Sequence, residues 1–210
     1  MPTTPSGQRG VPTASTSSAV QLKITLQGLK PPIWRRVVVP ADVTLAALHD
    51  IVQRAMGWTD AHLHAFEIDG ARYGCPGVDE FADGLLDERR HRLGALVSPR
   101  QRFTYEYDFG DDWRHQIVVE KALVPAPDVR LPTCIAGARA CPPEDCGGVH
   151  GYAELLEALD DPEHERHDEL LEWLDGPIDP EAFALDDINA ALAKLGPRPR
   201  RAPRARPTVH

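Results

Sequence analysis

The sequence of 210 residues lacks several features that would narrow its function at once. It has no apolar run close to the ~18 residues that a membrane-spanning helix needs, and it begins with neither the basic start nor the apolar stretch of an export signal. It contains no P-loop, GxGxxG, HExxH or GxSxG motif. We therefore expect a cytoplasmic protein without a membrane partner, and a binding or accessory module rather than an enzyme.

Cysteine and serine are also scarce. The four cysteines are expected to be reduced in the cytoplasm, which argues against a disulfide framework. After residue 18 the only serine is Ser98, and the segments expected to be C-terminal helices are acidic. A serine recombinase needs a nucleophilic serine supported by arginines, and a helix that can approach DNA. We therefore exclude the recombinase class.

Charge is unevenly distributed along the chain. The net charge is −9, and residues 196–210 contain five arginines and no acid, so residues 1–195 carry −9 − 5 = −14. Phosphate contacts depend on lysine and arginine, so an acidic body is not expected to bind nucleic acid in general. Nucleic acid is expected as a partner only through the Arg-rich tail, which would make the protein a nucleic-acid accessory factor.

Composition divides the chain into three parts. Residues 1–18 are rich in serine, threonine, proline and glycine without an apolar period, and they are predicted to be disordered. Residues 19–195 are predicted to form one domain. The Pro/Arg-rich tail, residues 196–210, is again predicted to be disordered.

The first half of the domain shows the two-residue period of strands. Strands are predicted at 20–27, 33–39, 62–68, 72–74, 103–109 and 113–120, and a polar loop at 76–92. One helix interrupts them: Leu45, Leu48, Val52 and Met56 share a helical face that ends at Gly57, with a capping residue at position 42 or 44.

The hairpin 103–120 is the clearest of these elements. Alternation places Phe109 and Trp113 inside, and the turn places Asp111 and Asp112 at the solvent-exposed tip. Beyond residue 151 the period changes to 3.6, with helical faces at 152–159, 170–174 and 183–192. The predicted fold is α+β: a mixed sheet built from hairpins with one early helix, followed by a helical C-terminal half.

Residues 131–152 hold three of the four cysteines in a segment bent by prolines and glycines. Thiolates gathered in a reduced chain favour zinc, and Cys134, Cys141 and Cys146 are the predicted ligands with His115 as the fourth. His62, His150 and Cys75 are alternatives for that fourth position. The spacing differs from the common pairs two to four residues apart, so small thiols that fill a tight loop are the other interpretation.

Acidic residues suggest a second kind of site. A ligand-binding cluster for a divalent ion, and with it a metal-dependent hydrolase or nuclease, would use Asp108, Asp111, Asp112, Glu144 and Asp145. The same acids also suit turns and helix caps. His62 and His64 lie two apart on a predicted strand, a spacing that can chelate a metal.

Three stretches together resemble one family. They are PPIWRR at 31–36, YDFGDDWRH at 107–115, and CPPEDCGG at 141–148 followed by Gly151 and Tyr152. The chain resembles the plasmid pRi ORF-3-like family, whose members also travel as "TnpR passenger" proteins of insertion elements. The resemblance spans about residues 19–195. It implies an α+β fold with a mixed sheet and an association with mobile elements.

Overall fold

The computed structural model describes residues 19–77, 84–126 and 128–195. The two ends predicted to be disordered, 1–18 and 196–210, lie outside the described residues, and so does the Arg-rich tail with its proposed contacts. The prediction that 19–195 is one domain stays a prediction.

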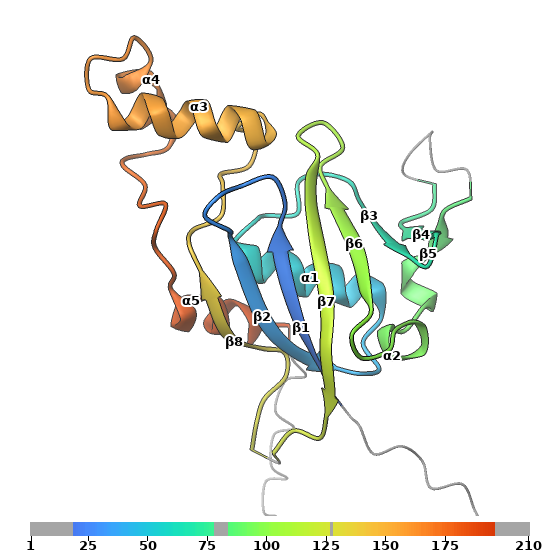
Figure 1. The fold of residues 1–210 in the computed structure, drawn as a ribbon. Coiled ribbons are helices and arrows are strands. Elements are labelled where there is room, and N and C mark those ends of the chain that lie inside the picture. Colours follow the sequence, from blue (N-terminus) through green and yellow to red (C-terminus); the bar gives the residue numbers. More distant parts are fainter. Residues whose placement is uncertain (1–18, 78–83, 127, 196–210) are drawn as a thin grey trace, which may run out of the picture.

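The described residues form one eight-stranded sheet of order β5-β4-β3-β6-β7-β1-β2-β8 (Figure 1). Its strands are β1 Ala19–Leu26, β2 Trp34–Pro40, β3 His64–Ile68, β4 Ala71–Gly74, β5 Leu86–Asp87, β6 Arg102–Tyr107, β7 Trp113–Leu123 and β8 Thr133–Ala138. All neighbouring pairs are antiparallel except β4 and β5. The sheet is therefore mixed, and the α+β class is confirmed.

The helices of the described part of the chain are α1 Leu45–Met56, α2 Leu93–Leu96, α3 Gly148–Asp160, α4 His167–Trp173 and α5 Leu185–Leu192, with a 3-10 turn η1 at Glu88–Arg90. Among them, none is long and apolar enough to cross a membrane. The early helix forms as predicted. The Thr44 hydroxyl accepts from the Ala47 amide at its start, and Gly57 ends it at φ 94°.

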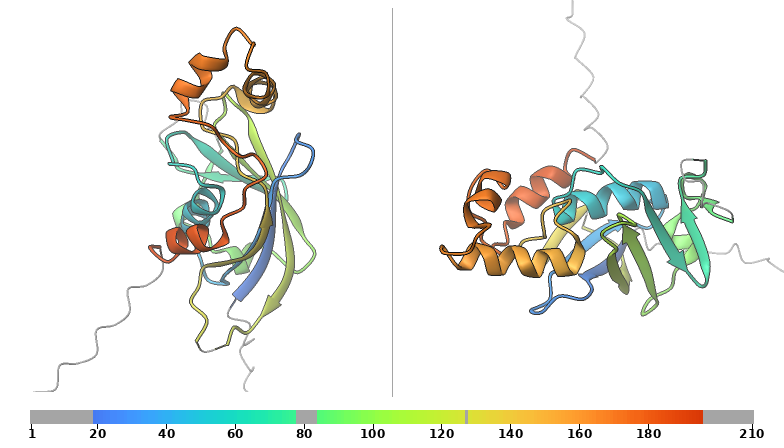
Figure 2. Two further views of the ribbon diagram at one scale, coloured as in Figure 1. Left: turned by 90° about the vertical axis from the view of Figure 1, so that its left-hand side faces the viewer. Right: turned by 90° about the horizontal axis from the view of Figure 1, so that it is seen from above.

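Helices α1 and α5 lie on one face of the sheet (Figures 1 and 2). The apolar side chains of α1 and the inward side chains of β1, β6 and β7 form the core between them. The Phe183 ring packs against β8 so closely that a Cβ at Gly137 would lie 2.4 Å from it. The opposite face of the sheet has no helix of the described residues over it (Figure 2).

Helices α3 and α4 form a lobe beyond one end of the sheet, beside the turn between β6 and β7 (Figure 1). The apolar face predicted for 152–159 is buried at Tyr152 and Leu155. In the helical face predicted at 170–174, Leu170 is buried and Trp173 is 48% exposed. The described chain beyond residue 151 contains helices and no strand, as predicted, whereas the strand β8 before it was not predicted.

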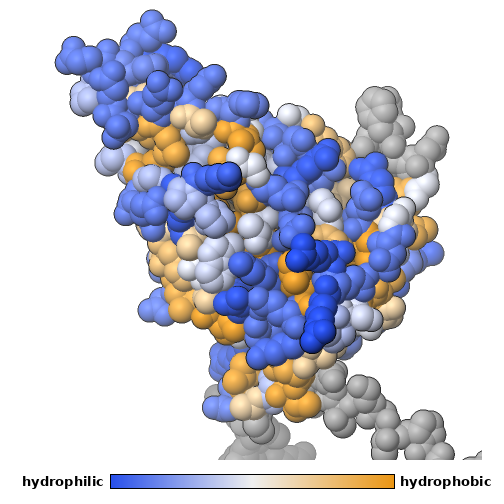
Figure 3. Space-filling model, viewed as in Figure 1, coloured by the Kyte–Doolittle hydropathy of each residue, from blue (hydrophilic) through white to orange (hydrophobic). Residues whose placement is uncertain are grey.

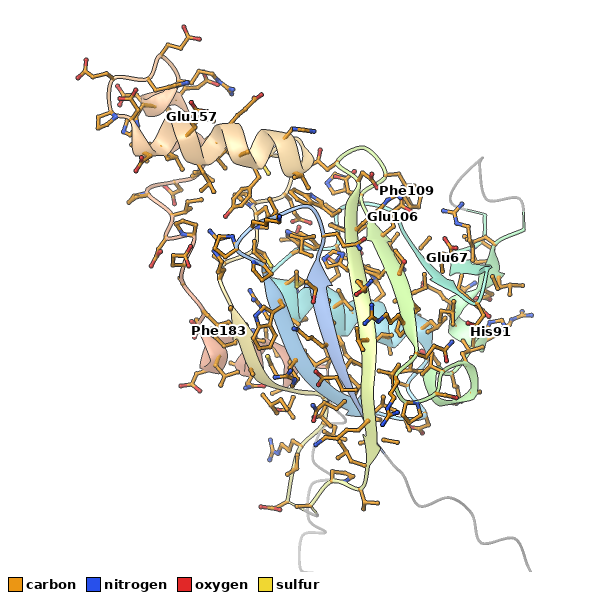
Figure 4. All side chains as sticks on the ribbon, in the orientation of Figure 1. Glu67, His91, Glu106, Phe109, Glu157 and Phe183 are labelled. Atoms are coloured by element: carbon orange, nitrogen blue, oxygen red, sulfur yellow. The ribbon has the colours of Figure 1, made fainter. Side chains whose placement is uncertain are left out.

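Two further details differ from the sequence prediction. The segment 76–92, predicted as a loop, contributes β5 and η1. Phe109, predicted to be inside, is 38% exposed at the hairpin tip (Figure 4). Strand β6 ends at Tyr107, and Asp108 adopts φ 56°, which breaks the alternation just before Phe109. Trp113 is buried as predicted.

Candidate functional site

The three cysteines predicted to bind zinc lie in different surroundings. Cys134 is buried on β8, where its thiol donates to the Ala136 carbonyl at 3.4 Å. The Cys141 sulfur lies 3.7 Å from the sulfur of Met56. Burial raises the pKa of Cys141 and of Cys146 to about 12, so both are neutral thiols. In the described segments, no group of three or more potential metal ligands within reach of one ion includes a cysteine.

His115, the predicted fourth ligand, lies in the core of the sheet. Its side chain is fully buried, and its Nδ1 atom lies 3.3 Å from the Tyr105 carbonyl. The ring meets the Trp58 ring edge-on at 5.3 Å. Burial lowers the pKa of His115 to about 4, so the imidazole is neutral. The structure therefore does not bring His115 together with the three thiols.

Three of the five predicted acids make hydrogen bonds or ion pairs within and between the loops near the β6–β7 turn. Asp112 pairs with Arg114 at 2.6 Å, and Asp111 accepts the Gly147 amide at 3.2 Å. Glu144 accepts hydrogen bonds from the hydroxyls of Tyr107 and Thr59. These contacts tie the hairpin and the loop after α1 to the segment that precedes α3.

The other two acids converge on a histidine. The Nε2 atom of His62 lies 3.0 Å from Oδ1 of Asp145 and 3.6 Å from Oδ2 of Asp108. That nitrogen is buried, and it makes no hydrogen bond within the described part of the chain. The three side chains offer ligand atoms that all lie within 4.8 Å of one another. We call His62, Asp108 and Asp145 the HDD cluster.

Local backbone features bring these residues together. The other carboxylate oxygen of Asp108 accepts the amides of Gly110 and Asp111, which leaves Oδ2 free to face His62. Close approach of the Asp145 loop depends on glycine, because a Cβ at Gly148 would lie 2.4 Å from the Asp111 carbonyl oxygen. A Cβ at Gly151 would lie 1.9 Å from the Cys146 carbonyl oxygen. The glycines noted in the sequence thus serve to dock this loop on the hairpin.

A second layer of contacts fixes the segment that carries His62. The Tyr107 hydroxyl accepts the Ala61 amide at 3.0 Å while it donates to Glu144. Burial and the bond to Glu144 raise the pKa of Tyr107, so this phenol stays protonated. The His62 ring in turn lies edge-on to the Tyr107 ring at 5.8 Å. The orientation of His62 is therefore set by contacts that involve no metal.

A neighbouring cluster joins His49, Asp60 and His64. Both nitrogens of His49 already have partners: Nδ1 lies 2.8 Å from the Tyr105 hydroxyl and Nε2 lies 2.7 Å from Asp60. The rings of His49 and His64 are stacked at 3.4 Å and 5°, so their in-plane lone pairs lie in two separate parallel planes, a poor arrangement for binding one ion. His64 bonds Glu88 at 2.8 Å. This cluster fastens α1 to β3 and thereby supports the loop between them, which carries His62.

The HDD cluster borders a groove of about 510 Å³ between α3, α4 and the loop before α3. Asp145 belongs to both, and its side chain is 68% exposed. The groove floor is apolar, with Leu155 and Leu170, and its rim carries Glu154, Arg166, Glu169, Glu172 and Trp173. Asp145 is therefore the member of the cluster that a molecule in this groove would meet.

The sequence pointed to part of this arrangement. Asp108 and Asp145 were among the predicted ligand-binding acids, and His62 was noted as a chelating residue. The sequence paired His62 with His64, yet the structure assigns the two histidines to different clusters. The sequence signal for the cluster is the density of charged residues and glycines in 107–115 and 144–151. Such stretches favour tight turns, and these are the two turns that supply Asp108 and Asp145 beside His62.

The comparisons with known proteins agree with the resemblance seen in the sequence. The family model described as "Plasmid pRiA4b ORF-3-like protein" matches residues 18–187. The uncharacterized protein y4hQ of Sinorhizobium fredii is 42% identical over 182 residues, 85% of this chain and 93% of that protein. The crystal structure of protein MM3350 of unknown function from Methanosarcina mazei is similar, with a TM-score of 0.75 and 39% identity. The match covers 80% of this chain and 96% of that one. The chain belongs to the plasmid pRiA4b ORF-3-like family.

Proposed function

We propose that this protein is a cytoplasmic binding module that holds a divalent metal ion in the HDD cluster. One observation carries the proposal: the Nε2 atom of His62 is buried, makes no hydrogen bond within the described residues, and faces two carboxylates. An imidazole nitrogen between two carboxylates, without a hydrogen bond to either, is a set of donor atoms that a divalent ion can join.

Zinc is the ion that we expect. One imidazole and two carboxylates suit zinc and also manganese, and the two negative charges balance a divalent ion. Three protein ligands would leave a fourth coordination position of a tetrahedral ion for water or another ligand. The thiolate site predicted from Cys134, Cys141 and Cys146 stays a prediction, and the same metal analysis tests it.

A metal-dependent hydrolase or nuclease is the second candidate. The specific observation in its favour is the groove beside Asp145, which would let a substrate reach an ion with an open position.

The arrangement does not support recombinase chemistry, because Ser98 is an exposed loop residue remote in sequence from the cluster. Four free thiols support a reducing compartment. The plasmid origin named in the family description supports a role as an accessory protein of mobile elements.

Elemental analysis of protein purified without a histidine tag tests the proposal. We expect about one zinc or manganese per chain, lost in His62→Gln and in Asp145→Asn. The matched control is Asp112→Asn, which removes an acid of the same hairpin that pairs with Arg114. If Cys141→Ser or Cys146→Ser loses the ion while His62→Gln keeps it, the metal belongs to the thiols instead. Metal-free wild-type protein that takes up no added zinc would refute both sites.

A further inference from the structure

The uncovered face of the sheet carries a charge opposite to that of the whole chain. Its side chains alternate with the buried ones along each strand, and its charged members come from β1, β2, β3, β4, β6 and β7. The cations are Lys23, Arg36, Arg72, Arg102 and Arg114, and the acids are Glu67, Glu106 and Glu120. The balance of these strand residues is 5 − 3 = +2, and it falls to +1 when Asp112 of the turn, which pairs with Arg114, is counted, whereas the chain carries −9.

Strand register places three of these cations in a row that crosses the sheet. Arg36 on β2 lies opposite Lys23 on β1, Lys23 lies opposite Val118 on β7, and Val118 lies opposite Arg102 on β6. Figure 3 shows strongly hydrophilic side chains gathered in the middle of this face. A shallow depression of about 550 Å³ beside the row also contains Arg100 and Lys121. We call Arg36, Lys23 and Arg102 the cationic row.

The next row along the strands has a different character. Trp34 lies opposite Thr25, Thr25 opposite Gln116, and Gln116 opposite Thr104. Trp34 is half-buried, and Lys23 and Arg36 approach its ring at 4.9 and 5.1 Å. Such cation–π contacts at exposed sites are worth only about 0.5–1 kcal/mol, so a phosphate can draw the cations away. An aromatic ring, two hydroxyls and an amide thus lie about 7 Å from the cationic row.

We propose that this face binds single-stranded nucleic acid, in contrast to the sequence expectation that only the tail does so, with phosphates on the cationic row and bases on the row of Trp34. Single strands are bound where cations follow the backbone and aromatic rings stack with the bases, which every base permits. The threonine hydroxyls and the Gln116 amide supply donors and acceptors for base edges. A duplex presents its bases only in grooves, so it cannot use the second row on a sheet face.

The acidic side chains of this face limit its expected affinity for phosphates. Glu120 pairs with Arg36 at 2.7 Å and also accepts from the Gln21 amide. The bond to Arg36 lowers the pKa of Glu120, which therefore stays ionised and competes with a phosphate. Glu67 and Glu106 lie on β3 and β6 (Figure 4). We therefore expect this face to bind single-stranded nucleic acid weakly except at low salt. Removal of the Glu120 carboxylate should raise that affinity.

Fluorescence anisotropy of a labelled single-stranded oligonucleotide of about 12 nucleotides, with the full-length chain, tests the proposal. Log K should fall with log salt at a slope of about −2 for three phosphate contacts. Lys23→Gln and Arg102→Gln should each reduce that slope by about 0.7, and Glu120→Gln should raise the affinity. The matched control is Arg54→Gln, an exposed cation on α1 at the other face, which should change nothing.

The variant Trp34→Leu tests whether the face recognises nucleic acid bases or only the negative charge of a polyanion. It should weaken the single strand at least about fivefold and leave heparin binding unchanged. Replacement of all five tail arginines by serine shows whether the tail alone is responsible. The proposal is overturned if no binding is seen up to about 100 µM protein at low salt. It is equally overturned if a duplex binds as well as the single strand, or if only the tail variant loses binding.

Discussion

The buried histidine of β7 should set much of the protein's sensitivity to acid. His115 is fully buried and its pKa is lowered to about 4, whereas a histidine in the unfolded chain titrates near 6.5. The unfolded chain therefore binds the proton more tightly. The stability contributed by the neutral ring is complete above about pH 6.5 and is lost as the pH falls towards 4.

The size of the effect follows from the two pKa values. Each pH unit below 6.5 costs about 1.36 kcal/mol until the folded state also binds the proton, so the loss is about 2 kcal/mol by pH 5. Urea unfolding of wild type and of His115→Leu at pH 7 and pH 5 measures it. The variant should lose about 2 kcal/mol less than wild type between the two pH values.

A matched control removes a histidine that is exposed. His150→Gln on α3 should keep the wild-type dependence on pH, because that ring is in solvent in both states. Equal losses in wild type and His115→Leu would refute the reasoning. That result would mean that the His115 ring has a partner in solution that stabilises its charged form, and a carboxylate would be the first suspect.

Three further changes test the fold and the site. Trp113→Ala on β7 should cost about 3–5 kcal/mol in urea unfolding, since the side chain is 1% exposed, and a cost below about 1 kcal/mol would contradict the packing. Asn189→Ala should cost about 1–3 kcal/mol, because the amide bonds both the N–H and the carbonyl of Cys134 on β8 at 2.8 and 3.0 Å. Gly151→Ala should displace the loop at Cys146 and abolish metal uptake while the far-UV spectrum is kept, and a variant that binds metal normally would show that the loop does not position the cluster.

The early elements could be predicted because their information is local. The helix α1 has an apolar face, a cap at Thr44 and a glycine stop at Gly57, all within fifteen residues. The strand β1 alternates strictly. Neither depends on a distant partner to define its period, so both were placed within one or two residues of their observed bounds.

In the β6–β7 hairpin, the φ angle of one residue, Asp108, ends the alternation of buried and exposed side chains. The alternation through Phe103, Tyr105 and Tyr107 predicts that Phe109 is also buried. Asp108 adopts a left-handed conformation and uses its carboxylate to hold the turn, so the phase is lost after Tyr107. A period-two rule cannot anticipate this, because the cause is a side-chain bond to the backbone rather than hydrophobicity.

The candidate site could be predicted only as a set of acids. Asp108 comes from the β6–β7 turn, His62 from the loop after α1, and Asp145 from the loop before α3. Their meeting depends on how the lobe docks against the end of the sheet, which no local pattern encodes. The three cysteines are close in sequence, yet Cys134 belongs to β8 and pairs with Val37, whereas Cys141 and Cys146 belong to the segment between β8 and α3.

The position of β1 has a consequence for synthesis on the ribosome. The first strand lies between β2 and β7, and Ala19 pairs with Leu123. At 5–20 residues per second, about 5–20 s pass between the appearance of β1 and that of its second neighbour. During that interval one edge of the β1–β2 hairpin and its apolar face remain unsatisfied. The nascent chain therefore exposes a strand edge with unpaired backbone groups early in synthesis, and we expect it to bind chaperones until β7 has emerged.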